Sequence, residues 1–244
     1  VVGTFIVVTH PGFTGSGGAF FGLIDIADPN ALAWSATNTT GMVVLTTPPT
    51  WVAQYNGRAC YFVNPGLGQP ALVLSDSLDP ATVTNADQVL TFGDNVPITC
   101  GLGLPLNNQL GGIIQALIVF KGASNLFQVT GDYGSTDNPL TINSLNVATG
   151  TLAPNSLAAT PYGMAFISPE GLRIIDMNAH VSPPIGDAGN GVTSAFIYAL
   201  EPSRTCAAAN ANVIRISVKN GGAVGSPVQE YWYHINRQCW SGPH

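Results

Sequence analysis

The stretch Trp51–Val63, WVAQYNGRACYFV, decides the fold. It contains two runs of strand-forming residues, Trp51–Tyr55 and Arg58–Val63, separated by Asn56-Gly57. Asn-Gly readily adopts the positive backbone φ angles that a two-residue turn between antiparallel strands requires. The stretch therefore predicts a β-hairpin.

Four more segments repeat the plan of strand, glycine-bearing turn and strand. They are Gly3–Ile26, Gln115–Thr130, Met164–Met177 and Asn212–Asn236. The five turn glycines, at positions 12, 57, 122, 171 and 221, are separated by 45, 65, 49 and 50 residues. Repeats of about 40 to 50 residues in a strand-rich chain are typical of four-stranded propeller blades. We therefore predict an all-β fold, a β-propeller-like array of antiparallel hairpin blades over residues 1–244. We attribute the long interval to an insertion near residues 85–107. A β-sandwich or barrel with coincidental turn spacing is the alternative.

The ends of the chain match module boundaries. Ala33-Trp34-Ser35 closes the first module and Cys239-Trp240-Ser241 closes the fifth, and the chain starts without Met. We expect both ends to be cuts within a longer polypeptide. An unclosed array would expose apolar blade faces, with side chains such as Phe5, Phe20 and Trp232.

The composition favours a chain that is covered by other protein. Hydrophobic residues make up 45% of the 244 residues and charged residues only 8%, against about 25% charged in an average domain. The net charge is −6 and the seven basic residues do not cluster, which argues against a grip on nucleic acid. The longest apolar run, Ile113–Phe120, is far shorter than the roughly 20 residues of a membrane-spanning helix.

The four cysteines, at positions 60, 100, 206 and 239, form no C-x-x-C pair. Their number allows two disulfides. In a large chain with few cysteines we expect four buried, reduced thiols instead.

Three close pairs of acids are candidates for glycosidase chemistry, which needs two carboxylates across a cleft. The pairs are Asp25/Asp28, Asp76/Asp79 and Asp132/Asp137. Asp28 and Asp79 precede proline and Asp132 follows a strand, as turn residues do, so we interpret the pairs as turns. The histidines are scattered and are not spaced for a metal site. They are His10, His180, His234 and His244.

Two further motifs have a structural interpretation. Tyr231-Trp232-Tyr233 resembles a sugar-binding platform, but alternation on a strand places both tyrosines on one face, which favours packing between blades. The glycine-rich stretches Gly15–Gly18 and Gly101–Leu104 lack the strand-to-helix setting of a phosphate loop and are expected to be turns. We assign no catalytic, cofactor-binding or metal residue, no cofactor and no enzyme activity.

Several stretches resemble tail proteins of short-tailed bacteriophages. They are Leu106–Gly122 (LNNQLGGIIQALIVFKG), Asn125–Asp132 (NLFQVTGD), Ala159–Asp176 (ATPYGMAFISPEGLRIID) and Tyr233–His244, and the likeness runs over most of the chain from about Val52. The resemblance implies a structural subunit of the tail nozzle or hub. Such subunits form a ring of identical copies, commonly six, below the portal and adaptor, and carry tail fibres.

In this family viral DNA only passes through the channel that the ring helps to close. The resemblance also implies a place in the virion, assembly in the cytoplasm of the bacterial host, and no membrane partner. The alternative, from a different class, is a carbohydrate-binding or glycan-cleaving propeller of a receptor-binding or depolymerase protein.

Overall fold

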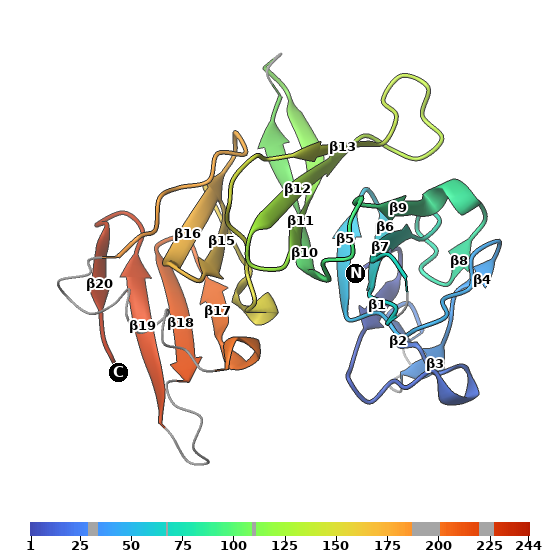
Figure 1. Cartoon of the computed structure of the whole chain (residues 1–244), viewed down its shortest axis with the longest axis horizontal. Helices are drawn as coiled ribbons and strands as arrows, with labels where there is room; N and C mark the ends of the chain where they lie inside the picture. The colour runs from blue at the N-terminus through green and yellow to red at the C-terminus, as the bar shows by residue number, and fades with distance from the viewer. Residues whose placement is uncertain (29–33, 67, 109–110, 187–200, 220–226) are drawn as a thin grey trace. The chain divides into compact units, whose positions relative to one another are not determined.

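The structure is a computed structural model that describes residues 1–28, 34–66, 68–108, 111–186, 201–219 and 227–244 (Figure 1). It is all-β, as predicted. The helical elements among the described residues are short 3-10 turns, at η1 (Ser16–Gly18), η2 (Ala86–Gln88), η3 (Pro154–Ser156) and η5 (Pro202–Arg204). Among these same residues, no helix is long and apolar enough to cross a membrane.

Consecutive strands form five successive sheets. The first contains β1 (Phe5–Val8), β2 (Phe21–Asp25) and β3 (Ser35–Thr37). The second contains β5 (Trp51–Tyr55), β6 (Arg58–Val63), β7 (Ala71–Leu74) and β9 (Val89–Thr91). The third contains β10 (Ile98–Asn107), β11 (Ile113–Lys121), β12 (Asn125–Thr130) and β13 (Thr141–Ser144). The fourth contains β14 (Ala158–Thr160), β15 (Gly163–Ser168) and β16 (Gly171–Asp176). The fifth contains β17 (Cys206–Ala209), β18 (Val213–Lys219), β19 (Val228–His234) and β20 (Cys239–Ser241). A parallel pair, β4 (Thr40–Gly41) and β8 (Thr82–Val83), lies outside this series.

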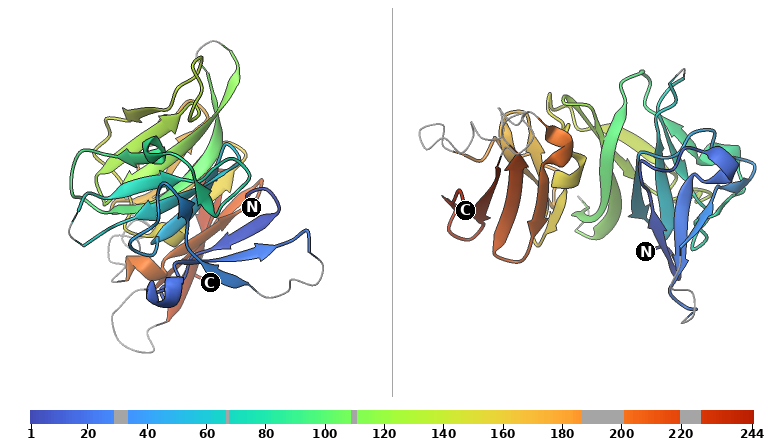
Figure 2. Two further views of the ribbon diagram at one scale, coloured as in Figure 1. Left: turned by 90° about the vertical axis from the view of Figure 1, so that its right-hand side faces the viewer. Right: turned by 90° about the horizontal axis from the view of Figure 1, so that it is seen from below.

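Each predicted hairpin matches two neighbouring strands of one sheet, namely β1–β2, β5–β6, β11–β12, β15–β16 and β18–β19. Within each sheet the strands run up and down side by side (Figure 2). Asn56 and Gly57 have φ angles of 47° and 71°, as the predicted turn requires. The turn of the fifth hairpin lies outside the described residues.

The 65-residue interval has a simple origin. In the second sheet the hairpin is formed by the first two strands, whereas in the third it is formed by the second and third strands. Residues 85–107, where we expected an insertion, contain η2, β9 and β10. The segment thus supplies the last strand of one sheet and the first strand of the next.

The described chain divides into two compact units, and the division passes through the third sheet. The first comprises Val1–Gly103, Leu117–Val119 and Val129–Ile142, and the second comprises Leu104–Ala116, Phe120–Gln128 and Asn143–His244.

In the first unit, the first and second sheets share an apolar core. Phe21 of β2 and Tyr61 of β6 are fully buried, and their ring centroids lie 4.7 Å apart. Val73 of β7 joins the same cluster, and Phe20 and Leu23 pack against it half-buried. This face of the first sheet is therefore covered by the second sheet.

The stretch Gly101–Leu104 lies inside strand β10, so the predicted turn is wrong. A Cβ atom at Gly101 would lie 2.5 Å from the ring of Phe62, and one at Gly103 would lie 2.1 Å from the carbonyl oxygen of Gln54. Glycine in a strand commonly marks such a close approach by another backbone. These two glycines let the third sheet contact the second sheet.

The second unit continues the same pattern. Rings of Phe120 in β11 and Phe166 in β15 lie 4.9 Å apart. Leu172 of β16 and Ile216 of β18 belong to one buried cluster between the fourth and fifth sheets. Each sheet thus meets the next one in sequence through apolar side chains or glycines, as successive blades do. The closed propeller stays a prediction.

The exposed apolar residues differ in part from those expected. Phe5, Phe20 and Trp232 are half-buried. On the first sheet the exposed side chains are instead Ile6 and Val8, which alternate with the inward-facing residues of β1.

Candidate functional site

The acids of the first two candidate pairs organise turns. Asp25 and Asp79 each accept a hydrogen bond from the backbone N–H two residues later, both at 3.0 Å. Asp76 accepts bonds from the backbone and the hydroxyl of Thr84, at 3.2 and 3.1 Å. Asp28 is exposed. The interpretation of these residues as turn formers fits this geometry.

Asp132 takes part in a structural network. Its Oδ1 atom lies 3.0 Å from Nε of Arg58, whose side chain is only 10% exposed. Nη1 of Arg58 donates to the backbone carbonyl of Ser75 at 3.0 Å, and its guanidinium lies 5.9 Å from the ring of Tyr133. The guanidinium neutralises the carboxylate and ties it to β6, while Asp137 is exposed. This arrangement does not present two acids to a substrate.

The four histidines lie at separate positions. His10 Nδ1 accepts a hydrogen bond from Gly12, His180 lies near Asp176, His234 contacts Ser241, and His244 lies against the Trp232 ring. In the described part of the chain, no group of three or more His, Cys, Asp or Glu side chains is placed to hold a metal ion.

All four cysteines are free, and only two of them are buried. Burial raises the pKa of the Cys60 thiol to about 12 and also raises that of Cys100. The prediction of burial is wrong for Cys206 and Cys239. These two lie on β17 and β20, the edge strands of the fifth sheet, on the face opposite its core.

The aromatic triplet divides between the two faces of β19, as predicted. Tyr231 and Tyr233 are 7% and 6% exposed and belong to the core between the fourth and fifth sheets. Trp232 faces the other way, and its Nε1 donates to Oε1 of Glu230 at 2.6 Å. Packing between sheets therefore accounts for the two tyrosines.

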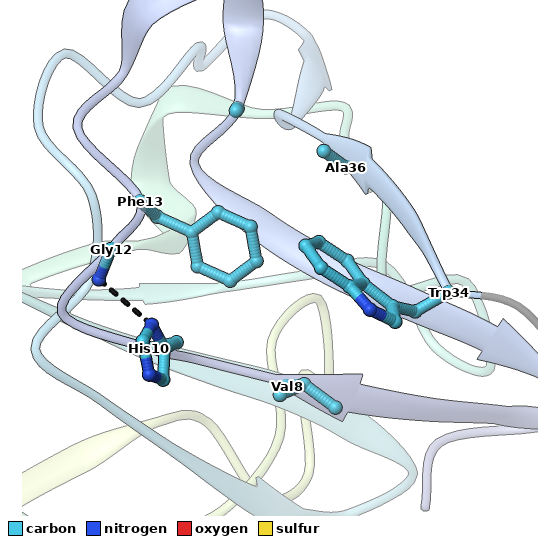
Figure 3. Close-up of a pocket in the computed structure, with 7 residues that line it drawn as sticks. Val8, His10, Gly12, Phe13, Trp34 and Ala36 are labelled. Atoms are coloured by element: carbon cyan, nitrogen blue, oxygen red, sulfur yellow. Dashed lines mark hydrogen bonds between the residues drawn. The ribbon is translucent and has the colours of Figure 1, made fainter.

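A hollow on the first sheet was not predicted. It is a pocket of about 450 Å³ on the first sheet, lined by Val8, His10, Gly12, Phe13, Ala19, Trp34 and Ala36 (Figure 3). The rings of Phe13 and Trp34 meet edge to face, with centroids 5.2 Å apart. A Cβ atom at Gly22 would lie 2.8 Å from the Trp34 ring, so glycine on β2 allows the indole to lie against the strand.

A second hollow of about 370 Å³ adjoins the first and shares His10 and Phe13 with it. Its other lining residues are Thr9, Pro11, Thr14, Pro48, Pro49 and Thr50. We call the two hollows together the Phe13 cleft. The sequence signal was a pair of aromatics on either side of a glycine-rich loop, but only the pairing of β2 with β3 brings Trp34 back over Phe13.

Neither a protein-family model nor a curated protein matches this chain.

Proposed function

We propose that the chain is a structural subunit of the tail nozzle or hub of a short-tailed bacteriophage. The observation that carries the proposal is the serial contact of consecutive antiparallel sheets through apolar residues and glycines. Every residue of strands β6 and β15 is buried, so each of these strands is covered on both faces. Sheets that are covered on both faces suit a structural component.

The charge pattern agrees with this role. Only 8% of the residues are charged, the net charge is −6 and the basic residues do not cluster in the sequence, whereas proteins that hold DNA by its phosphates need a basic patch. Viral DNA would therefore pass without being retained. In this proposal identical copies, commonly six, form a ring that contacts the portal, the adaptor and the tail fibres.

The glycan-cleaving alternative is less well supported. Retaining and inverting glycosidases hold two carboxyl groups about 5 to 9.5 Å apart across the bond to be cut. Among the candidates, Asp25, Asp76 and Asp79 bond to their own turns and Asp132 is paired with Arg58.

The test uses purified, intact virions of a phage that encodes this polypeptide. Antibodies raised against residues 1–244 should label the tail in electron micrographs, and subunit-resolution imaging should place the chain in a ring around the tail axis. Labelling of the capsid shell alone, or absence of the polypeptide from purified virions, would contradict the proposal.

A further inference from the structure

Trp34 presents a large aromatic surface to solvent. The residue is 55% exposed, although its ring touches Gly22 and meets Phe13 edge to face. The face of an aromatic ring carries partial negative charge, and it attracts the weakly positive C–H groups on the flat side of a pyranose. A rigid, half-exposed indole is therefore a suitable stacking platform for a sugar ring.

His10 supplies a directed polar group next to this platform. Its Nδ1 atom accepts the Gly12 N–H at 2.8 Å, so in the neutral imidazole the proton is on Nε2. Nε2–H then remains as a donor for a ligand oxygen. The position of the imidazole is set by the tight turn that follows β1.

The adjoining hollow has the chemistry of a hydroxyl-binding surface. Thr9 and Thr14 line it, and a hydroxyl both donates and accepts hydrogen bonds. Thr50 also lines it, but its hydroxyl donates to the carbonyl oxygen of Phe62 and accepts from Nδ2 of Asn64. Among the described residues that line the two hollows, none is Asp, Glu, Lys or Arg. The cleft is thus matched to a neutral ligand rather than to a phosphate, a nucleotide or an acidic sugar.

We propose that the Phe13 cleft binds a short neutral oligosaccharide, with one sugar ring stacked on Trp34 and the next over the threonine-lined hollow. The two volumes, about 450 and 370 Å³, lie in the range of small-ligand sites. An apolar peptide side chain would fill the first hollow but offer no hydrogen bond to the hydroxyls of Thr9 and Thr14 in the second. This binding role is additional to the tail function and does not depend on it.

The experiment measures binding of maltotriose, cellotriose and chitotriose to the chain by saturation-transfer NMR and calorimetry. At least one trisaccharide should bind. Trp34→Ala should weaken that binding at least tenfold, whereas Trp34→Phe, which keeps an aromatic face, should weaken it only about two- to threefold. His10→Ala should weaken it several-fold. Tyr162→Ala removes an exposed aromatic from the other unit and should leave the affinity unchanged.

Three results would overturn the inference. They are failure of all three trisaccharides to bind, unchanged affinity in Trp34→Ala, and a change of oligomeric state in Trp34→Ala by sedimentation, which would make this face a protein interface. If Trp34→Ala does not fold, His10→Ala decides the question, because His10 is exposed and its replacement leaves the core intact.

Discussion

Replacing Gly103 with alanine should specifically destabilise the first unit. Gly103 lies in β10, and an added Cβ atom would sit 2.1 Å from the carbonyl oxygen of Gln54 in β5. Ordinary contact begins at 3.4 Å, so the two strands would have to separate by 1.3 Å at this point. The carbonyl oxygen belongs to the backbone and the Cβ atom is bonded directly to it, so rotation of a side chain cannot relieve the contact.

The expected magnitude follows from two opposing effects. Overpacking a well-filled site costs about 1–3 kcal/mol, and a backbone clash of this severity belongs at the upper end. Alanine also lowers the conformational entropy of the unfolded chain, which raises the free energy of unfolding by about 0.4–1 kcal/mol. Gly103→Ala should therefore lower the free energy of unfolding by about 2–2.6 kcal/mol.

The assay is urea unfolding followed by tryptophan fluorescence. Nε1 of Trp51 donates to the carbonyl oxygen of Gly101 at 2.9 Å, so Trp51 reports directly on contact between β5 and β10. The matched control is Gly66→Ala in the same unit, because a Cβ atom there meets nothing within 4 Å. The control should be unchanged in stability or gain up to about 1 kcal/mol relative to the parent. Equal unfolding midpoints for the two variants would refute the reasoning.

Three further predictions concern the side chains. Arg58→Met should lower the free energy of unfolding by about 2 kcal/mol, because a buried carbonyl loses its donor. Asp132→Asn keeps an acceptor and should cost less than about 1 kcal/mol, so equal losses in urea titrations would argue against the network. Iodoacetamide without reductant should add to the two exposed cysteines of the folded chain and to all four in urea, as counted by intact mass; fewer than four adducts in urea would reveal a disulfide. The pKa of Glu230 is lowered by the hydrogen bonds that Arg215 and Trp232 donate to it, so this carboxylate stabilises the fold above its unfolded pKa and loses that contribution as the pH falls through its folded pKa. In Glu230→Gln the free energy of unfolding should therefore fall less steeply as the pH is lowered. An unchanged dependence of that free energy on pH would count against this assignment.

The hairpins could be predicted because their signals are local. Asn56-Gly57 and the apolar runs on either side of it contain everything that the β5–β6 turn needs. The segment Met164–Met177 likewise has its turn glycine, Gly171, directly between two strand-forming runs, and it folds as β15 and β16. Periodicity and turn chemistry act over a few residues, so the sequence displays them directly.

The glycines of β10 show where local reasoning fails. Gly101-Leu-Gly-Leu104 has the composition of a turn, yet it lies within a ten-residue strand. Its glycines serve contacts with Gln54 and Phe62, which are about 40 to 50 positions earlier in the chain. No short window contains both partners, so the reason for glycine at these positions becomes visible only in the folded sheet.

A second reason explains why the sequence predicted neither the Phe13 cleft nor the exposure of two cysteines. When both faces of a strand carry apolar residues, as in β1, alternation predicts two faces but not which of them a neighbouring sheet covers. In β1 the second sheet covers the Val7 side, which leaves Val8 beside Trp34 at the surface. In the fifth sheet, the face that carries Tyr231 and Tyr233 packs into the core. Cys239 lies on the opposite, exposed face. In a chain of stacked sheets, the exposed sites are therefore hard to predict from the sequence. The residues that form them have the same apolar character as those that the next sheet buries.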